Sequence, residues 1–143
     1  MFNIVEMAEE LRSELGGQGI SYPMHLENYV KIVVRAIKKF YVDINRPEQY
    51  DTTLYTTNEE NQVCYDHEFA LDEETYIYIV AKMMYFGIAA TEQCGDNSKS
   101  YTTNALTVTN AKEGFLSIKQ ILGDLELERL RVYHKMVRYT LPT

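Results

Sequence analysis

Apolar residues recur at three- and four-residue intervals in four stretches of this 143-residue chain, a spacing that places side chains on one face of a helix. The pattern predicts four helices, at about 2–15, 23–43, 72–90 and 109–139. The first is expected to end at a glycine pair, and the last is long and amphipathic. The residues predicted to face inward from the first two helices are Ile4, Ala8, Leu11, Leu15, Leu26, Tyr29, Val30, Val33, Ile37, Phe40 and Tyr41.

The third predicted helix is apolar on almost every side between residues 76 and 90, so we expect the other helices to surround it. Asp72 is expected to cap its amino end, with the two acids that follow at the positive end of the helix dipole. Gly87 and Gly123 fall inside predicted helices, where glycine costs about 1 kcal/mol relative to alanine. Close approach of a neighbouring helix is the expected compensation.

The connection between the second and third helices contains two β-prone runs, residues 52–56 and 62–65. They flank the turn-forming segment 58–61, which predicts a β-hairpin. A further β-prone run, 106–109, follows a predicted loop at 95–98.

These elements predict a mainly α fold, a small bundle of about four helices with a long C-terminal helix and a β-hairpin-like insertion at about 46–70. Residues 1–143 are expected to form a single domain, because this length leaves no room for a second core. Hydrophobic residues make up 45% of the chain, which favours a folded protein over a disordered one. Most of the twelve tyrosines are expected to lie half-buried around the core, and tyrosine also suits protein interfaces.

Charge is distributed unevenly along the chain, whose formal net charge is -7. Residues 43–74 contain ten acids and only one base, Arg46, so this segment carries -9 and the remainder +2. Phosphate contacts need lysine and arginine, which argues against nucleic acid as a partner of the acidic segment.

No catalytic or metal-binding motif is found in the sequence. It contains no nucleotide-binding loop, metalloprotease pair or nucleophile elbow, so we expect no enzymatic activity and no cofactor. Cys64 and Cys94 are too isolated for a disulfide framework or a zinc site, and His67 between two acids is expected to be a loop histidine. The apolar stretch 76–90 is interrupted and shorter than the roughly 20 residues that a bilayer needs, so a soluble cytoplasmic chain is expected.

Three sets of residues are candidates for protein contacts. The last helix ends in interleaved basic and aromatic residues without a glycine or asparagine stop, which suggests a terminus that docks. The second helix carries a basic outer face, although such a face is more often simply solvated. The third set is the acidic pair at the hairpin tip. In the last helix the set consists of Tyr133, Met136, Arg138, Tyr139 and Leu141. In the second helix it consists of Lys31, Arg35, Lys38 and Lys39, and at the hairpin tip of Glu59 and Glu60.

The order of these elements resembles the head-tail connector, or adaptor, proteins of tailed bacteriophages over roughly residues 24–143. The resemblance rests on the helical order and on three segments, 69–77 (FALDEETYI), 101–109 (YTTNALTVT) and 133–139 (YHKMVRY). Residues 1–22 depart from this pattern.

The resemblance implies a structural virion protein of the neck, assembled in the host cytoplasm without contact with a membrane. Such a subunit forms a homo-oligomeric ring, a dodecamer in the family, beneath the portal protein and above the next neck or tail protein. DNA passes through the ring without sequence-specific binding. On this basis the end of the last helix, including Tyr133 and Arg138, is expected to dock on the portal, and the basic face of the second helix on a neighbouring subunit.

Two questions stay open at this point. Glu59 and Glu60 would either line the channel, where they repel DNA phosphate, or lie on the rim against residues 31–39 of the adjacent subunit. The alternative function is a small helical nucleic-acid-binding regulator that reads DNA with its second or fourth helix. A pI near 5.0 and the lack of a compact helix-turn-helix pattern favour the connector.

Overall fold

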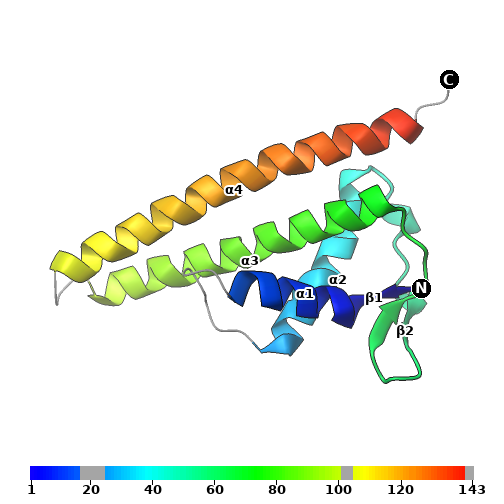
Figure 1. The fold of residues 1–143 in the computed structure, drawn as a ribbon, viewed down its shortest axis with the longest axis horizontal. Helices are drawn as coiled ribbons and strands as arrows, with labels where there is room; N and C mark the ends of the chain where they lie inside the picture. Colours follow the sequence, from blue (N-terminus) through cyan, green and yellow to red (C-terminus); the bar gives the residue numbers. More distant parts are fainter. Residues whose placement is uncertain (17–24, 101–104, 141–143) are drawn as a thin grey trace.

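The described part of the chain forms four α-helices and a small sheet (Figure 1). The computed structural model describes residues 1–16, 25–100 and 105–140, and for 92–100, 105–117 and 138–140 it describes the backbone alone. In chain order the helices are α1 (Ile4–Gly16), α2 (Leu26–Asp43), α3 (Leu71–Ser100) and α4 (Ala105–Thr140). The long helices α3 and α4 run antiparallel, and α1 and α2 pack on the other side of α3. The predicted mainly α class is confirmed.

Two predicted element boundaries are wrong near the junction of α3 and α4. The segment 95–98, expected to be a loop, continues α3, and 106–109, expected to be a strand, belongs to the first turns of α4. Helix growth is cooperative once a turn has formed, whereas the β-propensity of threonine and valine depends on having a neighbouring strand. Among the described residues no strand lies beside this segment.

The predicted hairpin is confirmed, with strands β2 (Tyr55–Thr57) and β3 (Val63–Tyr65). Residues 52–54 are not part of it, because they form a short 3-10 turn, η2 (Thr52–Leu54). The Asp51 carboxylate caps this turn by accepting a hydrogen bond from the Thr53 amide at 2.9 Å. A second 3-10 turn, η1 (Pro47–Gln49), precedes it. Sequence reasoning did not predict the third strand, β1 (Phe2–Asn3), which pairs with β3 to give the order β1-β3-β2.

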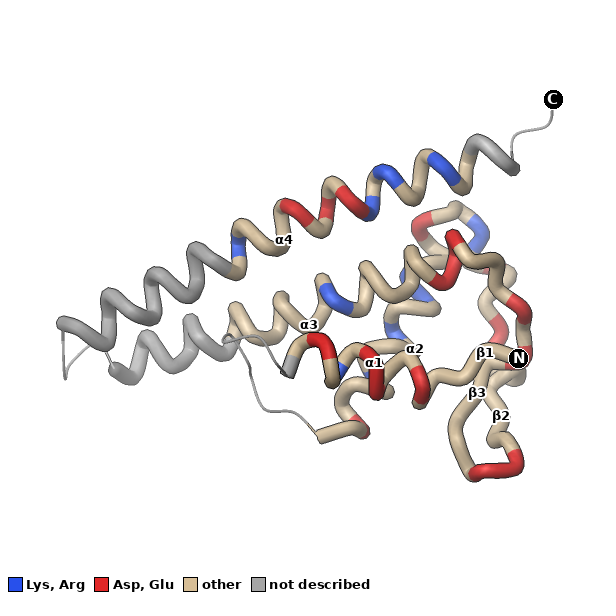
Figure 2. Tube along the Cα trace, viewed as in Figure 1, with Lys and Arg blue, Asp and Glu red and all other residues tan. Residues whose placement is uncertain are grey.

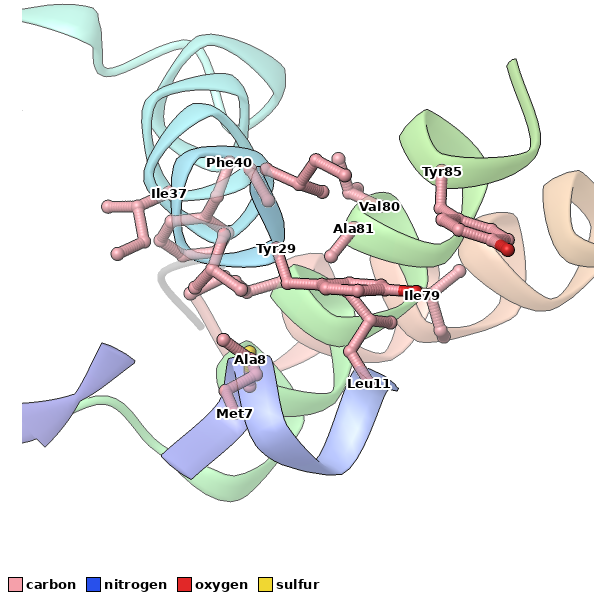
Figure 3. Close-up of a cluster of buried hydrophobic side chains, with 14 of the residues drawn as sticks. Met7, Ala8, Leu11, Tyr29, Ile37, Phe40, Ile79, Val80, Ala81 and Tyr85 are labelled. Atoms are coloured by element: carbon pink, nitrogen blue, oxygen red, sulfur yellow. The ribbon is translucent and has the colours of Figure 1, made fainter. Parts of the chain in front are cut away.

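Helix α3 is the central element, as predicted, since it packs against α1, α2 and α4. Figure 3 shows side chains from α1 and α2 meeting those of α3 in one apolar cluster. Tyr85 is fully buried despite its polar hydroxyl, and its ring stacks on Tyr29 with the centroids 5.8 Å apart. The labelled members of the cluster are Met7, Ala8, Leu11, Tyr29, Ile37, Phe40, Ile79, Val80, Ala81 and Tyr85.

The amino end of α3 is capped differently from the prediction. The helix begins at Leu71, and the Glu73 carboxylate accepts a hydrogen bond from the Ala70 amide at 2.8 Å. This is the reciprocal half of a capping box, in which the third helical residue reaches back to the residue before the helix. Asp72 instead lies 3.7 Å from the Lys135 ammonium and joins α3 to α4.

The two helical glycines do not mark close helix contacts. A Cβ atom added to Gly87 or Gly123 would meet no atom within 4 Å. The expectation that these glycines admit a neighbouring helix is therefore wrong. Open space lies beside both positions.

Candidate interaction surfaces

The described residues contain no evident reaction centre. No group of three or more His, Cys, Asp or Glu side chains among them is arranged to hold a metal ion. Cys64 is buried and unpaired, and the His67 ring packs on Phe69 at 4.8 Å. No helix in the described ranges is both long and apolar enough to cross a bilayer. The features that remain are surfaces, and each can be compared with the residues selected from the sequence.

The basic face of α2, defined here as Lys31, Arg35, Lys38 and Lys39, is exposed along its whole length. Lys39 is paired within its own helix, with Asp43 at 3.2 Å. For the other three side chains the described part of the chain offers no ion-pair partner. The opposite side of α2 is buried against α1 and α3. The basic face is therefore an uncovered surface whose positive charge is largely not neutralised by the described residues.

An open groove that was not predicted lies beside this face, between α2 and α3. Its volume is about 340 Å³, and Gly87 forms part of its wall because no side chain fills the space there. A glycine inside a helix, Gly87, was the one signal in the sequence that pointed to this groove. The lining residues are Ile32, Arg35, Met84, Gly87, Ile88 and Thr91.

Glu59 and Glu60 are exposed at the tip of the hairpin, where no described side chain neutralises them (Figure 2). The turn beneath them is held by the Asn58 side-chain oxygen, which accepts hydrogen bonds from the amides of Glu60 at 3.0 Å and Gln62 at 2.9 Å. Asn61 adopts a positive φ of 62°, which asparagine tolerates better than most residues. The acidic tip is thus carried on a well-braced turn.

Stacked aromatic rings fix the base of the hairpin. The Tyr65 ring stacks on Tyr50, with centroids 6.3 Å apart, and on Phe69, with centroids 5.9 Å apart. The Tyr50 and Tyr55 hydroxyls lie 2.9 Å apart, and the Tyr65 hydroxyl accepts a hydrogen bond from the Asp51 amide at 3.2 Å. Burial, followed by the hydrogen bond to Tyr50, raises the pKa of Tyr55. Several of the tyrosines therefore build the core and the hairpin support.

The end of α4 only partly matches the predicted docking element. Met136 is 8% exposed and belongs to the core, so it is not an available surface anchor, and Tyr133 is half-buried. Arg138, Tyr139 and Leu141 lie outside the described side chains. A cavity of about 170 Å³, also missed from the sequence, separates this end from α2. It is lined by Phe40, Ile44, Arg46, Gln49, Glu73, Met136 and Val137.

Arg129 lies near the basic end of α4 in the sequence, but it points inward and joins three helices. Its guanidinium donates to the Tyr76 hydroxyl at 2.7 Å and lies 3.8 Å from the Asp43 carboxylate. It also forms two hydrogen bonds with Glu126, at 2.8 and 2.5 Å, which lower the pKa of that carboxyl. Tyr76 in turn donates to Asp43 at 2.5 Å. The arrangement is a structural clamp, because its side chains satisfy one another.

Burial is the main cause of the raised pKa of Tyr76, and the carboxylate of Asp43 adds to it. A similar contact joins α1 to α3, where the Tyr78 hydroxyl donates to Glu14 and Lys82 lies 3.5 Å from the same carboxylate. Burial, then Glu14, raises the pKa of Tyr78. Both contacts hold helices together.

Comparison of the chain with protein-family models, with curated proteins and with solved structures found no match. A functional conclusion must therefore rest on the surfaces described above.

Proposed function

We propose that this chain is a structural virion subunit, a head-tail connector that forms a ring between the portal and the next neck or tail protein of a tailed bacteriophage. The observation that carries the proposal is the presence of two uncovered surfaces of opposite charge on one subunit. One is the basic face of α2, and the other is the acidic tip of the hairpin. The resemblance of the helix order to connector proteins supports the same role.

A closed ring needs this kind of asymmetry. Each subunit in a ring contacts its two neighbours through different surfaces, so the two surfaces must complement each other and not themselves. Lys31, Arg35 and Lys38 have no ion-pair partner among the described side chains, and Glu59 and Glu60 have none either. Contact between the basic face of one copy and the hairpin tip of the next would neutralise both sets.

The hairpin also suits a docking role because its conformation is fixed before contact. The Asn58 oxygen holds the turn, and the Asn3 amide donates to the Gln62 side chain at 2.8 Å, which anchors the hairpin to the strand before α1. A braced element loses little conformational entropy when it binds, so more of the contact energy is retained as affinity. We place Glu59 and Glu60 on the rim between subunits for this reason.

The end of α4, from Tyr133 onward, is the proposed contact with the portal. His134 and Lys135 are exposed there, next to the half-buried ring of Tyr133. In this role the protein catalyses no reaction and binds no cofactor, and DNA passes through the ring channel.

Charge-reversal variants test the ring. Electron micrographs of the purified chain at low salt are expected to show closed rings, which the change Glu59→Lys/Glu60→Lys should abolish. Lys31→Glu/Arg35→Glu should abolish them as well, whereas a mixture of the two variants should restore contacts between unlike copies. Glu6→Lys/Glu9→Lys is the matched control, since it changes the same charge at exposed positions on α1. Rings that survive the hairpin change would remove the rim contact from the proposal.

The exposed basic face of α2 is also the observation that favours the second candidate, a small nucleic-acid-binding regulator. The two functions separate in a mobility-shift assay with duplex DNA at low salt. Retention of the duplex by the wild type, and its loss in Lys31→Glu/Arg35→Glu, would favour the regulator. A freely migrating duplex is expected for the connector, because the chain as a whole carries a charge of -7.

A further inference from the structure

The outward face of α4 carries an apolar pair that its own chain does not cover. Leu127 is 59% exposed and Leu130 is 36% exposed, whereas Leu125 and Met136, on the other side of the helix, are buried. Figure 1 shows α4 as an outer layer that rests on α3, with no other described element on its far side. The two leucines form a small apolar patch on an otherwise polar face of the helix, which a partner could cover.

The pair belongs to a regular seam. Gly123, Leu127, Leu130 and His134 follow one another at intervals of four, three and four residues, and all four are exposed. This alternation is the spacing of the contact positions in a two-helix coiled coil. The seam lies opposite the face that packs on α3, so a second helix can approach it freely.

Charge along the same face changes sign at the apolar pair. Asp124 precedes the pair and Glu128 lies between the two leucines, whereas Arg131 and Lys135 follow the pair. Figure 2 shows this change from acidic to basic colour along α4. All four are exposed. Only Lys135 has an ion-pair partner among the described side chains, Asp72 at 3.7 Å.

We propose that this face binds the α4 of a second copy of the chain in the antiparallel direction. In a pairing centred between these two positions, Leu127 of one copy packs against Leu130 of the second copy, and Leu130 packs against Leu127. The same register brings Asp124 next to Arg131 of the second copy, and the two-fold axis repeats the contact. A parallel pairing would instead set the acidic ends together and the basic ends together, and like charges repel.

Gly123 fits this arrangement. A Cβ atom here would meet no atom of its own chain, and glycine is a poor residue for a helix interior, so the packing of the subunit gives no reason for it. In the antiparallel register Gly123 faces His134 of the second copy. The missing side chain leaves room for the imidazole ring.

The contact is expected to be weak. The described part of the seam spans about 17 Å at 1.5 Å per residue, and only two leucines per copy enter it. Interfaces of stable complexes bury about 1,200–2,000 Å², well beyond what so short a seam provides. We therefore expect a dimer that dissociates on the order of 10–100 µM, at the weak end for transient contacts.

Sedimentation velocity of the full chain over a range of concentrations tests the pairing. Leu127→Lys is expected to raise the dissociation constant at least tenfold, because it buries a charge in the seam. Val42→Lys is the matched control, since Val42 is 54% exposed on α2 and lies outside the seam. Far-ultraviolet circular dichroism of each variant verifies that the subunit remains folded. A chain that stays monomeric at all concentrations, or a Leu127→Lys variant that pairs as well as wild type, would overturn the inference.

Exchange of the charges tests the direction of pairing. Asp124→Arg alone and Arg131→Asp alone each set like charges together twice in an antiparallel dimer, so each should weaken it several-fold. The double variant Asp124→Arg/Arg131→Asp should recover wild-type affinity, and a mixture of the two single variants should form the mixed dimer. A double variant as weak as either single one would rule out the antiparallel register.

The pairing uses neither the basic face of α2 nor the hairpin, although it shares His134 and Lys135 with the proposed portal contact. The variant Lys31→Glu/Arg35→Glu is therefore expected to leave it intact. If the connector proposal fails, electron micrographs show no rings. If this inference fails, sedimentation velocity of Lys31→Glu/Arg35→Glu shows no dimer.

Discussion

At the scale of single residues, Arg129 shows what sequence position can and cannot reveal. It lies in a run of basic residues, and position in the sequence alone would group it with the exposed end of α4. Its spacing from Leu125 and Val132, four residues after one and three before the other, places it on the inward face instead. The partner Tyr76 could not be predicted, because it lies 53 positions earlier in the sequence and only folding brings the two residues together.

Loss of Arg129 is expected to destabilise the fold. Arg129→Ala removes the donor that serves Tyr76 and Glu126, and leaves Lys39, at 3.2 Å, as the cation beside the Asp43 side chain, which is only 15% exposed. Breaking a largely buried pair costs about 3–5 kcal/mol, an upper range here because Glu126 is partly solvated and Lys39 still faces Asp43. Urea unfolding followed by circular dichroism measures the change. Arg131→Ala, two residues away and exposed, should shift stability by less than about 0.5 kcal/mol, and equal effects of the two changes would remove Arg129 from the clamp.

At the scale of elements, the sequence predicted the buried faces of the helices better than the residues at which elements begin and end. The inward faces of α1 and α2 follow directly from the apolar spacing, and the hairpin follows from two β-prone runs around an Asn-rich turn. The junction of α3 and α4 was misplaced because threonine-rich segments have no fixed preference without tertiary context. Strand β1 has two residues, too few for any periodic signal, and it forms only because β3 presents an open edge.

Some of the candidate surfaces could likewise be predicted from the sequence and others could not. The exposure of the α2 face and of the hairpin tip was evident from the sequence, since both are polar positions opposite or between apolar ones. The groove between α2 and α3 was not, because a hollow depends on which side chains fail to meet across two helices.

Amide hydrogen exchange should separate α3 from the hairpin. The amides of residues 76–90 lie in the central helix and are expected to exchange more slowly than those of 55–65. Asn58→Ala removes the oxygen that accepts two turn amides, so hairpin exchange should become about tenfold faster while α3 is unchanged. Asn28→Ala, an exposed change on α2, is the control. Exchange in 76–90 as fast as in the hairpin would contradict the central position of α3.

At the scale of the whole molecule, the unusual tyrosine content predicts how stability depends on pH. Burial is the largest cause of a raised pKa at Tyr41, Tyr55, Tyr76 and Tyr78. These four side chains lie in different parts of the fold, from the hairpin base to the contacts of α3 with α1 and α4. The folded state therefore retains protons that an unfolded tyrosine, with a pKa near 10, gives up.

Alkaline pH is accordingly expected to unfold the protein. The contribution of these tyrosines is complete below about pH 10 and is lost as the pH rises further, since above that value the unfolded state binds fewer protons than the folded one. Each tyrosine that stays protonated lowers the free energy of unfolding by at most about 1.4 kcal/mol per pH unit. Urea unfolding between about pH 8 and pH 11, with tyrosinate absorbance as a direct probe, measures the slope. Tyr55→Phe should make the slope shallower, because it removes one half-buried hydroxyl whose pKa is raised in the folded state. Stability that does not fall between about pH 10 and pH 11 would show that these hydroxyls ionise as readily in the folded chain as in the unfolded one.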